Sequence, residues 1–166
     1  MTTGRTTPKY FKFQVEDSGG TLRDIPVATI NDIGLVYIEA TGLTALQDAV
    51  LGSFADQPNF EIDITGPYSN LAAQAASGSG AAPALSGSHT VLSGIDGLNV
   101  PLGFGIYFGI QANWATGDPV MGLPSSATNG IVCTKYVANP STMIYSARFR
   151  MVPGSAVPAW GTSAIS

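Results

Sequence analysis

Apolar and polar residues alternate with a period of two along several short runs of this chain, which is the pattern of β-strands with one buried face. The run at 59–66 places apolar residues on one face and polar residues on the other, and the run at 141–152 repeats this arrangement from Met143 to Met151. Further runs of strand character lie at 9–16, 21–40, 102–111 and 130–138. Glycine and proline separate the runs, so the sequence predicts a mainly β, antiparallel sandwich or barrel-like fold.

Two features predict how the strands are arranged. The segment VANPST (137–142) has the composition of a hairpin connection, so the runs on either side of it are expected to be antiparallel neighbours. In the run at 102–111, Gly103, Gly105 and Gly109 share one face, on which Tyr107 is the only side chain. Such a bare strand face predicts that another backbone or a neighbouring chain approaches closely there.

Helical signals occur in two short segments. Residues 88–95 carry an apolar stripe behind Ser88, a candidate N-cap, and predict one short flanking α-helix. Residues 42–54 have a weaker helical spacing between flanking glycines. Just before the helix expected at 88–95, an uncharged Ala/Gly/Ser-rich stretch predicts a long loop over 67–86.

This long loop is not interpreted as a linker, because each flank has only about three expected strands and these are too few for a core of its own. We therefore expect a single domain over residues 1–166. Its ends are expected to form an N-terminal arm (1–8) and a C-terminal tail (155–166) that docks on a neighbouring subunit through apolar residues such as Trp160.

The composition predicts an assembled protein. Only 11% of the 166 residues are charged, whereas 45% are hydrophobic. An average soluble domain has about 25% charged residues, so part of this surface is expected to be covered by other copies or other proteins. The net charge is −4 and the seven Lys and Arg residues are scattered, which argues against a conventional nucleic-acid-binding protein. No apolar run approaches the roughly 20 residues of a membrane span, so no membrane insertion is expected.

The sequence offers little for catalysis. His89, the one histidine, lies in a Ser-rich context that favours a packing role, and Cys133, the one cysteine, lies in an apolar run that predicts a buried thiol. No nucleophile elbow, phosphate-binding loop or Cys/His metal cluster occurs. Glu61 and Asp63 share a strand face as glycosidase carboxylates do, but so do the polar residues of any half-exposed strand. We expect no enzyme, no cofactor and no metal.

Five segments occur in an order that is informative as a set: KFQVEDSGGTLRDI (12–25), INDIG (30–34), FEIDITGPY (60–68), GSHTVLSGI (87–95) and GIVCTKYVANPSTMIYSARFRMVPG (130–154). In this order and spacing they resemble the major tail tube proteins of long-tailed bacteriophages. The resemblance covers roughly residues 12–154. The chain departs from the family pattern in its Ala/Gly insert at 71–85 and in GSFADQP (52–58).

The resemblance implies a β-sandwich with a flanking helix, of which six copies close into a ring. It implies that the sheets of neighbouring copies join edge to edge around a lumen, and that rings stack into a tube. Double-stranded DNA passes through such a lumen, which the tape-measure protein fills beforehand, and terminator and tip proteins close the ends. The expected location is the tail of the virion, assembled in the host cytoplasm.

Candidate residues follow from this implied role. An acidic wall repels phosphate, so some of five carboxylates are expected to face the lumen, or else they are ordinary solvated residues. They are Glu61, Asp63, Asp24, Asp32 and Glu39. Arg148 and Arg150 are expected to pair with Glu61 and Asp63 of the same or a neighbouring copy. The other candidate inter-subunit contacts are Trp160 in the tail and Ala75, Gly78 and Pro83 in the long loop.

Three other functions compete with the tail tube. A capsid decoration or head–tail joining protein is also structural but has a different symmetry. A surface binding module is a third hypothesis, for which 119–130 is a candidate recognition loop, and an enzyme is the fourth. The symmetry of the assembled protein separates the tail tube from the decoration or joining protein, and a strictly monomeric state at high concentration argues against the tail tube.

Overall fold

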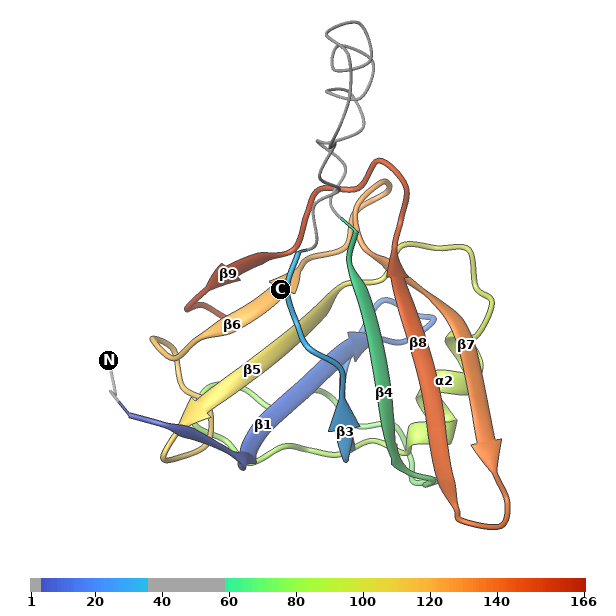
Figure 1. Ribbon diagram of the computed structural model, residues 1–166, viewed down its shortest axis with the longest axis horizontal. Coiled ribbons are helices and arrows are strands. Elements are labelled where there is room, and N and C mark those ends of the chain that lie inside the picture. The colour runs from blue at the N-terminus through green and yellow to red at the C-terminus, as the bar shows by residue number, and fades with distance from the viewer. Residues whose placement is uncertain (1–3, 36–58) are drawn as a thin grey trace, which may run out of the picture.

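The computed structural model describes residues 4–35 and 59–166, which form two antiparallel sheets (Figure 1). Sheet A has the strand order β2-β1-β5-β6-β9, and sheet B has the order β3-β4-β8-β7. In chain order the elements are β1 (Thr6–Glu16), β2 (Leu22–Ile25), β3 (Thr29–Ile30), β4 (Glu61–Pro67), α2 (Ser88–Ile95), β5 (Phe104–Ile110), β6 (Val120–Leu123), β7 (Ile131–Asn139), β8 (Ile144–Met151) and β9 (Ala159–Gly161). The predicted mainly β, antiparallel fold with one short helix is confirmed for these residues.

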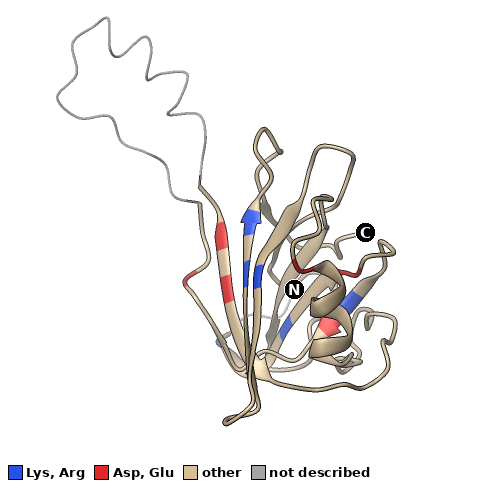
Figure 2. Ribbon diagram, turned by 90° about the vertical axis from the view of Figure 1, so that its right-hand side faces the viewer, with Lys and Arg blue, Asp and Glu red and all other residues tan. Residues whose placement is uncertain are grey.

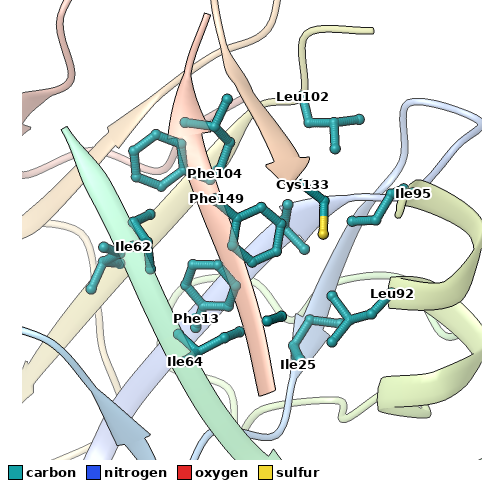
Figure 3. Packing of buried hydrophobic residues seen from close by; sticks show 14 of the residues in the cluster. Phe13, Ile25, Ile62, Ile64, Leu92, Ile95, Leu102, Phe104, Cys133 and Phe149 are labelled. Atoms are coloured by element: carbon teal, nitrogen blue, oxygen red, sulfur yellow. The ribbon is translucent and has the colours of Figure 1, made fainter. Parts of the chain in front are cut away.

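The core lies between the two sheets, as the period-two patterns predict. Alternate residues of β4 and β8 are 0–1% exposed, namely Ile62, Ile64, Tyr145, Ala147 and Phe149. Aromatic rings join the layers: the ring centroids of Phe13 and Phe149 are 6.0 Å apart (Figure 3). Phe60 stacks on Phe104 with centroids 5.4 Å apart. Burying a large apolar side chain stabilises a fold by about 1.5–3 kcal/mol, so this layer is the main source of stability.

Helix α2 packs its apolar stripe against sheet B. Val91, Leu92 and Ile95 are at most 2% exposed, which confirms the predicted stripe. The N-cap, however, is Gly87, and the prediction that Ser88 caps the helix is wrong. The Ser88 hydroxyl instead donates to the Pro67 carbonyl at 2.9 Å and accepts from the Ser69 N–H at 2.9 Å, because the incoming loop lies directly beside the first turn.

The predicted long loop is confirmed, and much of it lies on sheet A of its own chain. Residues 71–86, here called the strap, run along the outer edge of β2. The N–H of Ala76 donates to the Leu22 carbonyl at 3.1 Å, and the N–H of Ser86 donates to the Asp24 carbonyl at 2.9 Å. The strap therefore covers a sheet edge that is otherwise free to pair with another chain.

The glycine-lined face of β5 is also covered by its own chain. After β5 the backbone reverses at Gln111, whose φ is 62°, and returns across the strand. A Cβ atom added at Gly109 would lie 2.2 Å from the Ala112 carbonyl oxygen and 2.7 Å from the Trp114 nitrogen. The predicted close approach of another backbone is thus confirmed, and the approaching segment is residues 112–114.

The C-terminal tail forms a short strand on its own subunit, and Trp160, the residue expected to contact a neighbour, stays 58% exposed. Residues 159–161 form β9, which pairs with β6 and places Trp160 opposite Met121. The N–H of Ile165 then donates to the Tyr107 hydroxyl at 3.1 Å. The tail is thus held by the edge of β6 and by a buried cluster of Tyr107, Trp114 and Val120, against which Ile165 packs.

Candidate interaction surface

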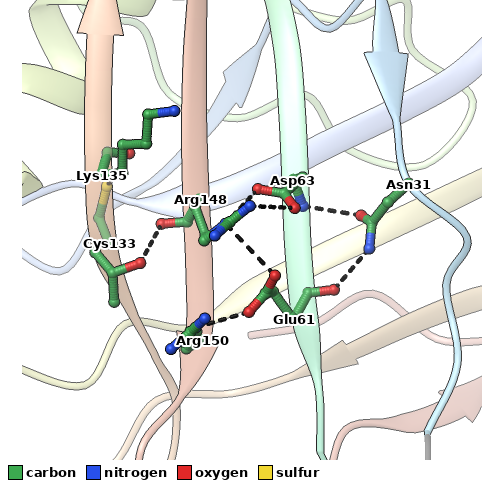
Figure 4. Close-up of polar contacts among 8 residues, drawn as sticks. Asn31, Glu61, Asp63, Cys133, Lys135, Arg148 and Arg150 are labelled. Atoms are coloured by element: carbon green, nitrogen blue, oxygen red, sulfur yellow. Dashed lines mark hydrogen bonds and ion pairs between the residues drawn. The ribbon is translucent and has the colours of Figure 1, made fainter.

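The outer face of sheet B carries a cluster of ion pairs (Figure 4). The antiparallel register of β4 and β8 sets Glu61 opposite Arg150 and Asp63 opposite Arg148. Arg148 donates to Asp63 through Nε at 2.7 Å and Nη2 at 3.1 Å, and Arg150 Nε lies 2.7 Å from Glu61 Oε2. The predicted pairing of these residues is confirmed, and it occurs within one chain.

A further contact links the Arg148–Asp63 pair to the Arg150–Glu61 pair. Arg148 Nε also lies 3.4 Å from Glu61 Oε1. The hydrogen bonds from Arg148 to Asp63, together with the charges of Asp63 and Glu61, raise the pKa of Arg148. Exposed pairs of this kind contribute little to stability, so their main effect here is to hold the register and to occupy the guanidinium groups.

Asn31 and Lys135 complete this face, and neither was predicted from the sequence. The Asn31 side chain donates to the Glu61 carbonyl at 3.0 Å and accepts from the Asp63 N–H at 2.8 Å, so it continues the hydrogen bonding of β3 along β4. Lys135 on β7 lies opposite Arg148 on the neighbouring strand β8 (Figure 4). The available signal for Lys135 is its place two residues before Val137, on the same face of the run at 130–138, whereas the position of Asn31 depends on a contact across 32 residues.

The described part of this face is not acidic. Its two carboxylates, Glu61 and Asp63, are matched by the cations of Arg148, Arg150 and Lys135. Figure 2 shows the acidic and basic positions on neighbouring strands of the sheet. The repulsive acidic wall expected from the sequence is therefore replaced by a face on which both carboxylates are paired with arginine.

Asp24 lies elsewhere, and the prediction that it is a lumen-facing carboxylate is wrong. It is 0% exposed, because the strap covers the outer face of sheet A at this point. Its carboxylate accepts hydrogen bonds from Gln14 Nε2 at 2.6 Å, the Ser77 N–H at 2.9 Å and the Ala84 N–H at 2.8 Å. Asp24 thus ties the strap to β1 and β2.

Lys12 is the buried cation beside Asp24. It is 5% exposed and donates to the Ser77 carbonyl at 3.0 Å, with its ammonium 4.7 Å from the Tyr107 ring centroid and 5.6 Å from that of Trp114. Burial lowers the pKa of Lys12, and the charge of Asp24 opposes this shift. Lys12 and Gln14 lie on the polar face of the alternating run at 9–16, and the structure shows that both side chains are buried.

The remaining candidates are dispersed. Asp32 is exposed just beyond β3, and Glu39 lies outside the described residues, as does the weaker helix predicted at 42–54. Trp160 is 58% exposed on β9, with its ring 5.6 Å from that of Phe108. On the strap, Ala75 and Gly78 are exposed and Pro83 is half-buried. The structure does not bring these contact candidates together with the ion-pair cluster.

Two apolar features lie near the edges of sheet B. Val137, Met143 and Ile144 are 50%, 55% and 46% exposed around the β7–β8 hairpin. At the opposite edge of sheet B, an open groove of about 400 Å³ lies between β1 and β3, lined by residues that include Phe11 and Ile30.

The histidine and the cysteine both have packing roles. His89 Nδ1 lies 3.0 Å from the Tyr136 hydroxyl, and the ring stacks near Tyr68 with centroids 5.1 Å apart. Cys133 is 2% exposed, and burial raises the pKa of its thiol to about 11, which confirms the predicted buried thiol. In the described part of the chain, no group of three or more His, Cys, Asp or Glu side chains is arranged to hold a metal ion. None of the described helices is long and apolar enough to cross a membrane.

Comparisons with known proteins add no identity: no protein-family model, curated protein or solved structure matches this chain.

Proposed function

We propose that this chain is a self-assembling structural protein of a virion, the major subunit of a bacteriophage tail tube. Six copies form a ring through sheet B, and rings stack into a tube in the virion tail after assembly in the host cytoplasm. The tube holds the tape-measure protein, meets terminator and tip proteins at its ends, and conducts double-stranded DNA. The observation that carries the proposal is a four-stranded sheet with one face in the core, one polar face, and two edge strands without a strand neighbour in the described chain.

The segments that resemble tail tube proteins support this proposal by their positions. Residues 12–25 span the β1–β2 hairpin, 60–68 span β4, 87–95 span α2, and 130–154 span the β7–β8 hairpin. Three of these segments build sheet B or the helix that packs on it. The low charged fraction of 11% also fits a surface that neighbouring copies cover.

The ion-pair cluster fits a conduit for DNA because its arginines are already paired, whereas an acidic wall would act by repelling phosphate. An arginine that is already bound to a carboxylate is a poor ligand for a phosphate, because a phosphate must displace that carboxylate. A face of paired charges therefore neither repels DNA strongly nor holds it, and the genome slides past.

Electron microscopy of the purified protein tests the assembly. Negative-stain images of the concentrated protein are expected to show rings or tubes about 100 Å across, a size that follows from six small domains around a duplex-wide channel. Isolated rings without tubes, or a symmetry other than sixfold, would favour a head–tail joining or decoration protein instead. A protein that is monomeric by light scattering at millimolar concentration would contradict the proposal.

Removing the carboxylates is expected to make the face bind DNA. The double variant Glu61→Gln and Asp63→Asn leaves Arg148 and Arg150 without ionic partners, so affinity for linear duplex DNA at low salt should rise about tenfold and fall steeply as salt increases. Gel-shift titration measures this. The matched control adds Arg148→Gln and Arg150→Gln to the same variant and should return DNA binding to the wild-type level. Equal binding by the wild type and the double variant would show that the pairing does not control access to the arginines.

A further inference from the structure

The outer face of sheet A carries a buried polar cluster that the proposed function does not use. Lys12 and Gln14 lie two residues apart on β1, and Asp24 lies opposite Gln14 on β2. All three side chains are at most 5% exposed. The strap covers them together with the rings of Tyr107 and Trp114, so the cluster is shielded from water.

The amine of Lys12 is held beside the side-chain amide of Gln14. Lys12 Nζ lies 3.0 Å from the Ser77 carbonyl oxygen, and Gln14 Nε2 lies 3.2 Å from the same oxygen. A Cβ atom added at Gly105, the residue opposite Gln14, would lie 2.5 Å from the Tyr107 ring, so this ring leans toward Gln14. Lys12 Nζ lies 4.7 Å from the centre of the ring, which places the amine along the strand toward Gln14.

Asp24 contacts the nitrogen of this amide. Its Oδ1 accepts from Gln14 Nε2 at 2.6 Å, and its Oδ2 accepts from the N–H groups of Ser77 and Ala84. Burial lowers the pKa of Lys12, and the charge of Asp24 opposes this shift. A lowered pKa makes an amine more available as a neutral nucleophile, and a carboxylate beside it can carry its protons.

The geometry points to an intramolecular isopeptide bond between Lys12 and Gln14, with Asp24 as the residue that transfers the protons. Lys12 Nζ bonds to Gln14 Cδ, and the bond from Cδ to Nε2 breaks. Asp24 takes one proton from the ammonium so that Nζ can attack, and gives it to Nε2 as this nitrogen leaves. A second proton passes from Nζ to the leaving nitrogen in the same way. Ammonium is therefore released, nothing is oxidised or reduced, and Asp24 ends as a carboxylate.

The site favours the linked product. The amine is already positioned at the amide, whereas water, which would hydrolyse the amide, is excluded. The reaction removes the charge of Lys12 from an interior where a charge is costly. The new amide N–H can donate to Asp24 in place of the one that is lost. The bond needs only the folded single chain, so it is independent of the tail tube proposal.

Mass spectrometry of the purified full-length chain tests the proposal. The intact chain is expected to be lighter than its sequence by one ammonia, about 17 Da, without any added reagent. Trypsin should no longer cleave after Lys12, and fragmentation of the peptide 10–23 should give no fragment that ends between residues 12 and 14. A peptide that is cleaved after Lys12, from protein kept folded at neutral pH for days, would overturn the proposal.

Variants identify the reacting groups. Lys12→Arg keeps a buried cation but has no nucleophilic amine, and Gln14→Met has a similar length but no amide, so both chains should keep their full mass. Asp24→Asn should slow formation of the bond at least about 100-fold, the usual contribution of a positioned acid or base. The matched control is Lys135→Arg, at an exposed lysine, and it should form the bond as wild type does. Where circular dichroism shows that a variant is unfolded, the wild-type peptide map alone decides.

Other mass changes would overturn the assignment. A loss of one water, about 18 Da, would place the bond between Lys12 and Asp24. A loss of one ammonia that maps to Asn129 and Gly130 would be succinimide formation at an Asn–Gly pair and would leave Lys12 unlinked. A loss of ammonia that persists in Lys12→Arg would exclude Lys12 as the nucleophile.

Discussion

Replacing Asp24 with Asn is expected to lower the free energy of unfolding by about 3 kcal/mol, because it removes one member of a buried charged cluster. The carboxylate accepts hydrogen bonds from Gln14 and from the N–H groups of Ser77 and Ala84. In the variant an amide nitrogen replaces one acceptor oxygen, so a buried N–H loses its partner. The ammonium of Lys12 also loses its nearby opposite charge.

The loss is expected to depend on pH. Burial lowers the pKa of Lys12 and Asp24 opposes this effect, so removing the charge of Asp24 lowers that pKa further. A lysine whose pKa is lower in the folded state than in the unfolded state costs stability at any pH at which the unfolded chain carries the charge. This cost disappears as the pH rises toward the pKa of the lysine in the unfolded chain. The stability deficit of Asp24→Asn should therefore shrink between neutral pH and about pH 10.

Urea unfolding, followed by tryptophan fluorescence across this pH range, measures both effects. The matched control is Asp32→Asn at a protein concentration too low for assembly. Asp24 and Asp32 were both candidate lumen-facing carboxylates, but Asp32 is exposed. Its stability should stay within about 0.5 kcal/mol of wild type. A loss of less than about 1 kcal/mol for Asp24→Asn, at the low end of the cost of an unsatisfied buried group, would mean that the strap does not depend on this carboxylate.

Replacing Gly109 with Ala is the second large effect, with an expected loss of about 3 kcal/mol. The added Cβ would lie 2.2 Å from the Ala112 carbonyl oxygen and 2.7 Å from the Trp114 nitrogen. Both are backbone atoms and cannot rotate away, so the segment after β5 must shift. Trp114 is 2% exposed and packs edge-on against Tyr107 with centroids 4.7 Å apart, so the shift also disturbs the cover over Lys12.

Gly78→Ala is the matched control for this substitution. Gly78 has open space around its Cα and a φ outside the left-handed region, so the added methyl group should leave stability unchanged or slightly higher. Chemical denaturation gives the two free energies, and the tryptophan emission maximum reports solvent access to Trp114. Equal stability of the Gly109 and Gly78 variants would show that the returning segment is loosely held.

The sequence predicted the features that depend on one strand and its immediate neighbours. The alternation at 59–66 and 141–152 identified the buried faces of β4 and β8, and VANPST identified the hairpin that joins β7 to β8. The opposite charges of Glu61 and Asp63 and of Arg148 and Arg150 suggested that they pair, but the pairing of β4 with β8, which brings Arg148 to Asp63 across 85 residues of chain, came from the tertiary structure. The bare face of β5 predicted a close approach but not the identity of the approaching segment.

Other features depend on contacts between distant residues, and for these the predictions from sequence were wrong or absent. Asp24 and Asp32 are both polar residues near strand ends, yet Asp24 is buried because the strap reaches it with Ser77 and Ala84, 53 and 60 residues later in the chain. The strand β9, which carries Trp160, was not predicted, because its pairing with the free edge of β6 leaves no local signal. Asn31 gave no local signal at all.

The sequence by itself thus predicted the alternating strands, the buried faces of β4 and β8, the β7–β8 hairpin and the flanking helix, because a period of two and helical spacing are local properties of the chain. Only the tertiary structure decided which polar face is covered and which sheet edges have no strand neighbour. The strap and β9 lie on the edges of sheet A, whereas β3 and β7 have no strand neighbour on their outer sides in the described chain. That choice depends on where long loops run, and no short-range pattern encodes it.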